Sequence, residues 1–181
     1  LIFHPASCGK LKREEALELT YKRFVETFNK MDEEGILDGL LLCPETMGKT
    51  MQIGTYSEVV DLCKVNEHLV PTFDFGHINS LEQGSLKTKD DYKRILDYCI
   101  EKLGFDRTNN CHIHFSKIQY GAKGEIKHLN YDDSIYGPEF DPLAEVLVEY
   151  NLSPRVICES MDKMPHDALI MKKIYLKTLD K

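Results

Sequence analysis

The sequence lacks the features of membrane and secreted proteins. No apolar run approaches the roughly 20 residues that a membrane-spanning helix needs. No basic start is followed by an apolar block, which is the pattern of a secretory signal peptide. We therefore expect a cytoplasmic protein without a membrane partner.

The sequence also lacks an excess of basic residues. It has 23 Lys and Arg against 30 Asp and Glu, which gives a net charge of -7 at pH 7. Proteins whose main role is non-specific adhesion to nucleic acid normally carry a basic excess, because they neutralise phosphates. The charge argues against that class, but only weakly against an enzyme whose metal ions supply positive charge locally.

No two of the six cysteines form a C-x-x-C pair. They are scattered singly, and several lie in apolar runs such as "GLLLCPE" and "LDYCI". Buried, reduced thiols are therefore a better interpretation than disulfides or a zinc knuckle. A phosphate loop is also excluded, because "GKT" at 48–50 lacks the earlier glycine of that motif. Lys49 and Gln52 remain candidates for a contact with substrate.

What the sequence does contain is an alternation of short apolar runs with longer amphipathic segments. Strands are predicted at 1–5, 38–45, 69–77, 111–118 and 154–160, and helices at 12–35, 55–66, 88–104, 141–151 and 167–179. Strands that alternate with helices of this length predict a parallel sheet with right-handed crossovers.

Each predicted strand ends in a residue able to bind a metal. These residues are His4, Glu45, Asp74 with His77, His114 and Glu159. They follow one another at intervals of about 30 to 45 residues, close to the length of one unit of an eight-stranded barrel. A barrel gathers its strand ends around one centre, so we predict a (β/α)8 TIM barrel rather than an open doubly wound sheet.

Five units do not close an eight-stranded barrel. We therefore expect residues 1–181 to be a single domain that forms the last five β-α units, the C-terminal portion of a larger barrel. Such an arc leaves two unpaired parallel edges. Self-association, or dependence on further segments, is the expected consequence.

The strand-end residues predict a metal site on chemical grounds alone. Carboxylates at the mouth of an apolar barrel are costly to bury unpaired, and a divalent cation satisfies several of them at once. A mixture of Asp, Glu and His ligands suits zinc, manganese or iron. His112 is expected to point toward the helical layer and to be structural.

Five stretches in order carry a resemblance to one family. They are "FHPAS" at 3–7, "CPETMGKTMQIGT" at 43–55, "FDFGHINS" at 73–80, "HIHFSK" at 112–117 and "VICES" at 156–160. The ordered set resembles the strand-end motifs of the endonuclease IV family, metal-dependent apurinic/apyrimidinic endonucleases on a xylose isomerase-like TIM barrel. The resemblance implies a hydrolase of DNA repair that cuts DNA at abasic sites.

In that family a trinuclear zinc cluster lies at the carboxyl end of the barrel. By resemblance, His4 binds one zinc and Glu45 bridges it to a second. Asp74, His114 and Glu159 complete the second site. His77 and His128 then belong to the third. The resemblance also makes Glu45 and Glu159 the catalytic residues, with Glu159 orienting or deprotonating the attacking water.

The sequence departs from the family at the third zinc. The family has an Asp-x-His pair there, whereas this sequence has Ile126 before His128. Either Glu125 or Asp132 is expected to substitute, unless the third metal is weak or missing.

Three functional hypotheses remain. The first is the phosphodiesterase with two or three zinc ions. The second is a sugar isomerase or epimerase on the same barrel, with one metal held by Glu45, Asp74, His114 and Glu159. The third is a non-catalytic fragment that binds metal. Metal stoichiometry distinguishes the first two.

Overall fold

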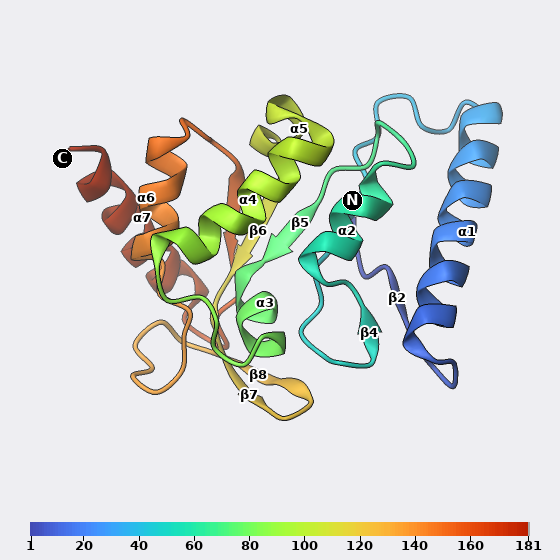
Figure 1. The fold of residues 1–181 in the computed structure, drawn as a ribbon. Helices are drawn as coiled ribbons and strands as arrows, with labels where there is room; N and C mark the ends of the chain where they lie inside the picture. The colour runs from blue at the N-terminus through green and yellow to red at the C-terminus, as the bar shows by residue number, and fades with distance from the viewer. Residues whose placement is uncertain (181) are drawn as a thin grey trace.

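The computed structural model describes residues 1–180, which form an arc of parallel strands covered by helices (Figure 1). The strands of the arc are β1 (Ile2–Phe3), β3 (Cys43–Pro44), β5 (Thr72–Asp74), β6 (His112–Phe115) and β9 (Arg155–Cys158). β1 pairs with β3, and β6 pairs with both β5 and β9, always in parallel. Parallel bridges from Leu42 to Leu69 and from Glu45 to Thr72 join β3 to β5.

Neighbouring strands in this arc follow one another in chain order. An open doubly wound sheet instead reverses its strand order at a switch point, so the observed order is that of a barrel. The predicted fold class is confirmed.

The main helices lie close to where the sequence predicts them. They are α1 (Arg13–Glu33), α2 (Tyr56–Cys63), α4 (Lys89–Leu103), α6 (Asp141–Glu149) and α7 (Met164–Leu179). Local signals explain their ends. At α2 the Thr55 hydroxyl accepts a hydrogen bond from the Glu58 amide at 3.2 Å, and the Glu58 carboxylate accepts one from the Thr55 amide at 2.9 Å.

The core lies between the strands and the helices. Phe73 of β5 and Ile113 of β6 are paired in register, and both are completely buried in one cluster with Tyr92 and Leu96 of α4. Because side chains alternate along a strand, the residues on either side of them face the interior of the arc. This alternation turns Asp74 and His114 toward the barrel centre.

The strand predicted at 69–77 ends three residues early. Helix α3 (Phe75–Leu81) starts directly after β5, and Asp74 caps it by accepting a hydrogen bond from the His77 amide at 2.8 Å. The capping aspartate ends the strand here. His77 therefore stands on a helix.

Residues 117–129 form an antiparallel hairpin that the sequence did not predict. It consists of β7 (Lys117–Gly121) and β8 (Gly124–Leu129). A Cβ on Gly124 would lie 2.0 Å from the carbonyl oxygen of Gly48, and the Glu125 amide donates to that oxygen at 2.8 Å. The hairpin therefore packs directly on the loop after β3.

Three smaller elements were also not predicted. β2 (Ala6–Ser7) pairs antiparallel with β4 (Gln52–Ile53), and α5 (Phe105–Asn109) follows α4. The six cysteines are free, and all but Cys158 are buried. Within residues 1–180, no helix is both long enough and apolar enough to cross a membrane.

Candidate metal centre

Four predicted ligands converge at the carboxyl ends of the parallel strands. Glu45, Asp74, His114 and Glu159 each offer one ligand atom, and these atoms lie within 4.8 Å of one another. Nδ1 of His114 lies 2.9 Å from Oε1 of Glu45 and 3.1 Å from Oε1 of Glu159. The side chain of Glu159 is 34% exposed, whereas the other three residues are buried.

These side chains shift each other's protonation in the metal-free centre. Burial by itself lowers the pKa of His114, but hydrogen bonds to Glu159 and Glu45 outweigh it and raise that pKa to about 10. The hydrogen bond from His114 lowers the pKa of Glu159 to about 2. The protonated ring of His114 is therefore the positive charge beside Glu45 and Glu159.

One oxygen at the centre has no hydrogen-bond partner. Asp74 is completely buried and uses Oδ1 to cap α3, whereas Oδ2 has no donor among the described residues. Burial raises the pKa of Asp74, since the charged form is poorly solvated. Nδ1 of His77 lies 3.4 Å from this oxygen but is bonded to the Thr46 carbonyl oxygen. A buried carboxylate oxygen without a hydrogen-bond donor is costly, and a cation would satisfy it. Three carboxylates and one imidazole fit a divalent cation such as manganese, iron or zinc.

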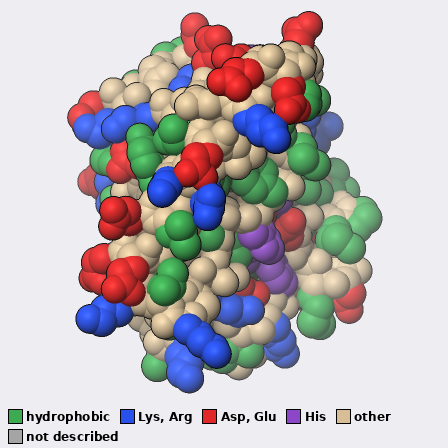
Figure 2. Space-filling view, turned by 90° about the vertical axis from the view of Figure 1, so that its right-hand side faces the viewer, with side chains coloured by type: hydrophobic (Ala, Val, Ile, Leu, Met, Phe, Trp, Pro, Cys, Tyr) green, Lys and Arg blue, Asp and Glu red, His purple; other side chains and the backbone are tan. Residues whose placement is uncertain are grey.

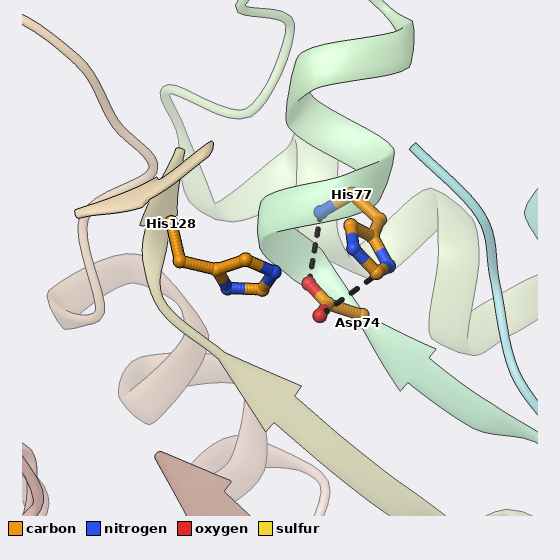
Figure 3. Close-up of side chains that lie close together, drawn as sticks. All are labelled: Asp74, His77 and His128. Atoms are coloured by element: carbon orange, nitrogen blue, oxygen red, sulfur yellow. Dashed lines mark hydrogen bonds and ion pairs between the residues drawn. The ribbon is translucent and has the colours of Figure 1, made fainter. Parts of the chain in front are cut away.

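A second group of possible ligands shares Asp74 with the first. Asp74, His77 and His128 offer ligand atoms within 4.8 Å of one another, from β5, α3 and β8, and their side chains point toward one another (Figure 3). The two histidine rings have centroids 5.4 Å apart.

Neighbouring residues fix the orientation of both rings. Nδ1 of His77 lies 2.9 Å from the carbonyl oxygen of Thr46, and Nδ1 of His128 lies 2.8 Å from the hydroxyl of Ser116. In each ring Nε2 is turned toward Glu125, at 3.5 Å for His77 and 4.0 Å for His128. A metal-binding histidine commonly holds its other ring nitrogen in this way.

Of the two carboxylates expected to replace the missing aspartate, Glu125 rather than Asp132 lies beside His77 and His128. Ile126 is 58% exposed, and Asp132 forms an ion pair with Lys163 at 2.8 Å. The register explains the substitution: Gln119 pairs with Lys127 and Tyr120 with Glu125, so Ile126 is the extra residue of a β-bulge. A bulge interrupts the alternation of side chains, which brings Glu125 rather than Ile126 to the face of His128.

His4 lies at the edge of the first group. Its Nε2 is 3.5 Å from Oε2 of Glu45, and its side chain is 64% exposed. Figure 2 shows histidine side chains gathered beside an acidic side chain on one face of the molecule. The structure thus brings all seven predicted ligands together, although their role as ligands remains a prediction.

The predicted direction of the His112 side chain was wrong. Residues two apart in a strand point to the same side, so His112 faces the barrel interior together with His114, while Ile113 packs in the core. Nδ1 of His112 is buried and has no hydrogen-bond partner in the described part of the chain. Burial lowers the pKa of His112, with Arg155 and His114 adding to the effect.

Sequence reasoning also missed the residues that support the ligands. Thr46 and Ser116 lie beside predicted ligands on the same strand ends, directly after Glu45 and two residues after His114. Their position close to predicted ligands in the sequence was the signal that pointed to them. Their contacts with the rings of His77 and His128 depend on α3 and the hairpin, neither of which was predicted.

Comparison with known proteins supports the fold. No protein-family model matches the chain. An uncharacterized protein of Methanocaldococcus jannaschii is 32% identical over 177 residues, which cover 97% of this chain and 62% of that protein.

Solved structures similar to the chain include two of D-psicose 3-epimerase. D-psicose 3-epimerase from Clostridium cellulolyticum H10, with D-tagatose, has a TM-score of 0.52 and 14% identity over 98% of this chain and 59% of its own. A D-psicose 3-epimerase structure in the presence of D-fructose has a TM-score of 0.55 and 17% identity over 90% of this chain and 57% of its own.

The chain therefore spans about three fifths of the length of these proteins. The likeness supports the barrel type of fold that the strand order shows. It does not support the narrower assignment to endonuclease IV.

Proposed function

We propose that the chain carries the metal-binding and proton-transferring residues of a ketose epimerase or isomerase. The observation that supports this most directly is the convergence of Glu45, Asp74, His114 and Glu159, with ligand atoms within 4.8 Å of one another. The similar solved structures are named D-psicose 3-epimerases, and they were determined with D-tagatose or D-fructose. Ketoses are therefore the substrate class we propose.

The chemistry requires a proton to leave and return at the carbon beside a carbonyl. A divalent cation held by the four residues would polarise the carbonyl oxygen and so acidify that C–H bond. Glu45 and Glu159 follow β3 and β9, which β5 and β6 separate in the arc. The two carboxylates therefore reach the centre from different sides.

This placement suits the removal of a proton from one face of a carbon atom and the return of a proton to its opposite face. One carboxylate takes the proton, the electrons of the C–H bond form a carbon–carbon double bond, and the carbonyl oxygen gains the charge. The other, protonated, carboxyl group then returns a proton to the opposite face. Without a metal, the hydrogen bond from His114 lowers the pKa of Glu159 to about 2, so its side chain is an ionised carboxylate.

Deuterium exchange tests the proposal. The protein is stripped with a chelator, reloaded separately with Mn²⁺, Co²⁺ or Zn²⁺, and incubated with D-fructose or D-tagatose in D₂O. We expect proton NMR to show loss of the signal beside the carbonyl only in metal-loaded samples, and not in Glu159→Gln. Protein that binds metal but exchanges neither sugar would overturn the proposal.

The second candidate function is metal-dependent cleavage of DNA at abasic sites, with zinc as the metal. The observation that favours it is the group of His77, Glu125 and His128 beside the first centre, because phosphodiester hydrolysis commonly uses more than one metal. Incision of a duplex carrying one abasic site, together with two or three bound metals per chain, would favour this function. One bound metal and ketose exchange would favour the first.

A further inference from the structure

Thr46 is a fully buried polar residue that stands directly after the predicted ligand Glu45. Its hydroxyl oxygen accepts a hydrogen bond from the Asp74 amide at 2.8 Å and donates one to the Asp74 carbonyl oxygen at 3.3 Å. A side chain that follows one ligand therefore bonds both backbone groups of another ligand, on the neighbouring strand.

These bonds extend the link between two strands past its last backbone contact. The Thr46 amide donates to the Thr72 carbonyl oxygen at 3.0 Å, beside the bridge from Glu45 to Thr72. Two residues further along β5, the acceptor for the Asp74 amide is the Thr46 hydroxyl. Since Asp74 is completely buried, loss of that hydroxyl would leave an N–H group without a partner or water. The hydroxyl thus ties Asp74 to the segment that carries Glu45.

The side chain of Asp74 has little freedom to correct a shift of its backbone. Its Oδ1 accepts a hydrogen bond from the His77 amide at 2.8 Å, which ties the carboxylate to the start of α3. Oδ2, the oxygen without a hydrogen-bond donor among the described residues, points wherever the backbone and this cap direct it. A displaced Asp74 backbone would therefore move Oδ2 relative to Glu45.

The hydroxyl and the backbone carbonyl of Thr46 contact different ligands. The carbonyl oxygen lies 2.9 Å from Nδ1 of His77, whereas the hydroxyl bonds only to Asp74. Substitution of the side chain keeps the carbonyl group. Such a variant therefore tests the contact with Asp74 separately from the contact with His77.

We propose that Thr46 is a positioning residue for the metal centre, whose hydroxyl holds Asp74 beside Glu45 so that both bind one cation. The inference rests on the proposed metal-dependent function. It predicts that removal of the hydroxyl weakens metal binding although every ligand is kept.

Calorimetric titration with Mn²⁺ tests this inference, with the melting temperature of each metal-free variant measured in parallel. Thr46→Val keeps the size of the side chain, and it should raise the Kd for Mn²⁺ by about 10- to 100-fold, the range typical of residues that support ligands. Thr46→Ser restores the hydroxyl and should keep the Kd within about threefold of wild type. Thr46→Ala places no methyl group against the Asp74 amide, so it carries the test if Thr46→Val does not fold.

Thr108→Val is the matched control. Thr108 is also completely buried, and its hydroxyl donates to the Gly104 carbonyl oxygen at 2.9 Å. It lies in α5, which precedes β6, whereas the metal centre lies at the opposite ends of the strands. The control should lower the melting temperature but leave the Kd within about twofold, because distant sites act independently.

The outcomes separate the two levels of the argument. If Thr46→Val or Thr46→Ala lowers the melting temperature but leaves the Kd within about twofold, Thr46 has only a structural role and the inference is wrong. An equal rise of the Kd in Thr46→Ser would also overturn it, since the hydroxyl would then not be the cause. Wild-type protein that binds no Mn²⁺, Co²⁺ or Zn²⁺ would overturn the proposed function and the inference together.

Discussion

Nδ1 of His77 lies 2.9 Å from the carbonyl oxygen of Thr46, and a carbonyl oxygen only accepts hydrogen bonds. The neutral ring therefore carries its proton on Nδ1 and its lone pair on Nε2, which is 3.5 Å from Glu125. The carbonyl group of Thr46, directly after the predicted ligand Glu45, thus leaves Nε2 of His77 free to bind a metal.

The first prediction applies to the second candidate function, DNA cleavage, which requires a second cation at His77, Glu125 and His128. Glu125→Gln should remove this cation and leave the first, because only the carboxylate between the two Nε2 atoms is lost. Metal analysis after dialysis should then fall from two ions per chain to one. Ile126→Asp is the matched control, since Ile126 is the exposed residue of the bulge, and it should change nothing. A higher metal content in Ile126→Asp would count against the assignment to Glu125.

The second prediction concerns Glu159. Glu159→Gln keeps the size of the side chain but removes a base and a charged ligand. We expect its rate of ketose proton exchange to fall by about 10²- to 10⁴-fold, the range for loss of a general base. Steady-state exchange at saturating metal is the measurement, with Glu101→Gln as a control on the outer face of α4. A rate within about threefold of wild type would exclude Glu159 as a base.

The third prediction concerns the stability of the metal-free protein. The pKa of His114 is raised from 6.5 to about 10, so its contribution is complete below pH 6.5 and is lost as the pH rises toward 10. The pKa of Glu159 is lowered from 4.5 to about 2, so its contribution is complete above pH 4.5 and is lost as the pH falls toward 2.

In chelator, the melting temperature should therefore be highest between about pH 4.5 and 6.5 and decline toward pH 10. Scanning calorimetry across this range is the measurement. His114→Gln should reduce the alkaline decline, and an identical decline in this variant would show that another group causes it.

The fourth prediction concerns the contact between the hairpin and the loop after β3. Gly124 has φ +91°, and a Cβ there would lie 2.0 Å from the Gly48 carbonyl oxygen. We expect Gly124→Ala to cost at least about 3 kcal/mol in urea unfolding, because strain and collision add. Gly39 has φ +72° with nothing within 4 Å of its Cβ position, so Gly39→Ala should cost only about 1–2 kcal/mol. Equal costs would show that the collision relaxes without penalty.

The fifth prediction concerns the open edges of the arc. Within residues 1–180, β1 pairs only with β3, and β9 pairs only with β6. Unpaired edges favour association, so sedimentation equilibrium should detect self-association. Ile157 is 41% exposed on β9, and Ile157→Lys should shift the equilibrium toward monomer, whereas Ile126→Lys on the hairpin should not. A monomeric wild type at high concentration, with one cooperative melt, would refute this.

Much of the fold was predictable because it follows from local patterns. Alternating strands and helices, and caps such as Thr55 with Glu58, depend on residues that are neighbours in the chain. Strand ends in a parallel arc meet at one rim, so Glu45, Asp74, His114 and Glu159 were predictable as a group.

Tertiary structure decided the features that depend on distant contacts. The β-bulge at Ile126 exists because the hairpin pairs in a particular register, and that bulge selects Glu125. The close approach of Gly124 to Gly48 places the hairpin against the site. The sequence by itself determined which residue types stand at the strand ends. Only packing between segments far apart in the chain decided which of their atoms face one another, because side-chain direction depends on register and burial.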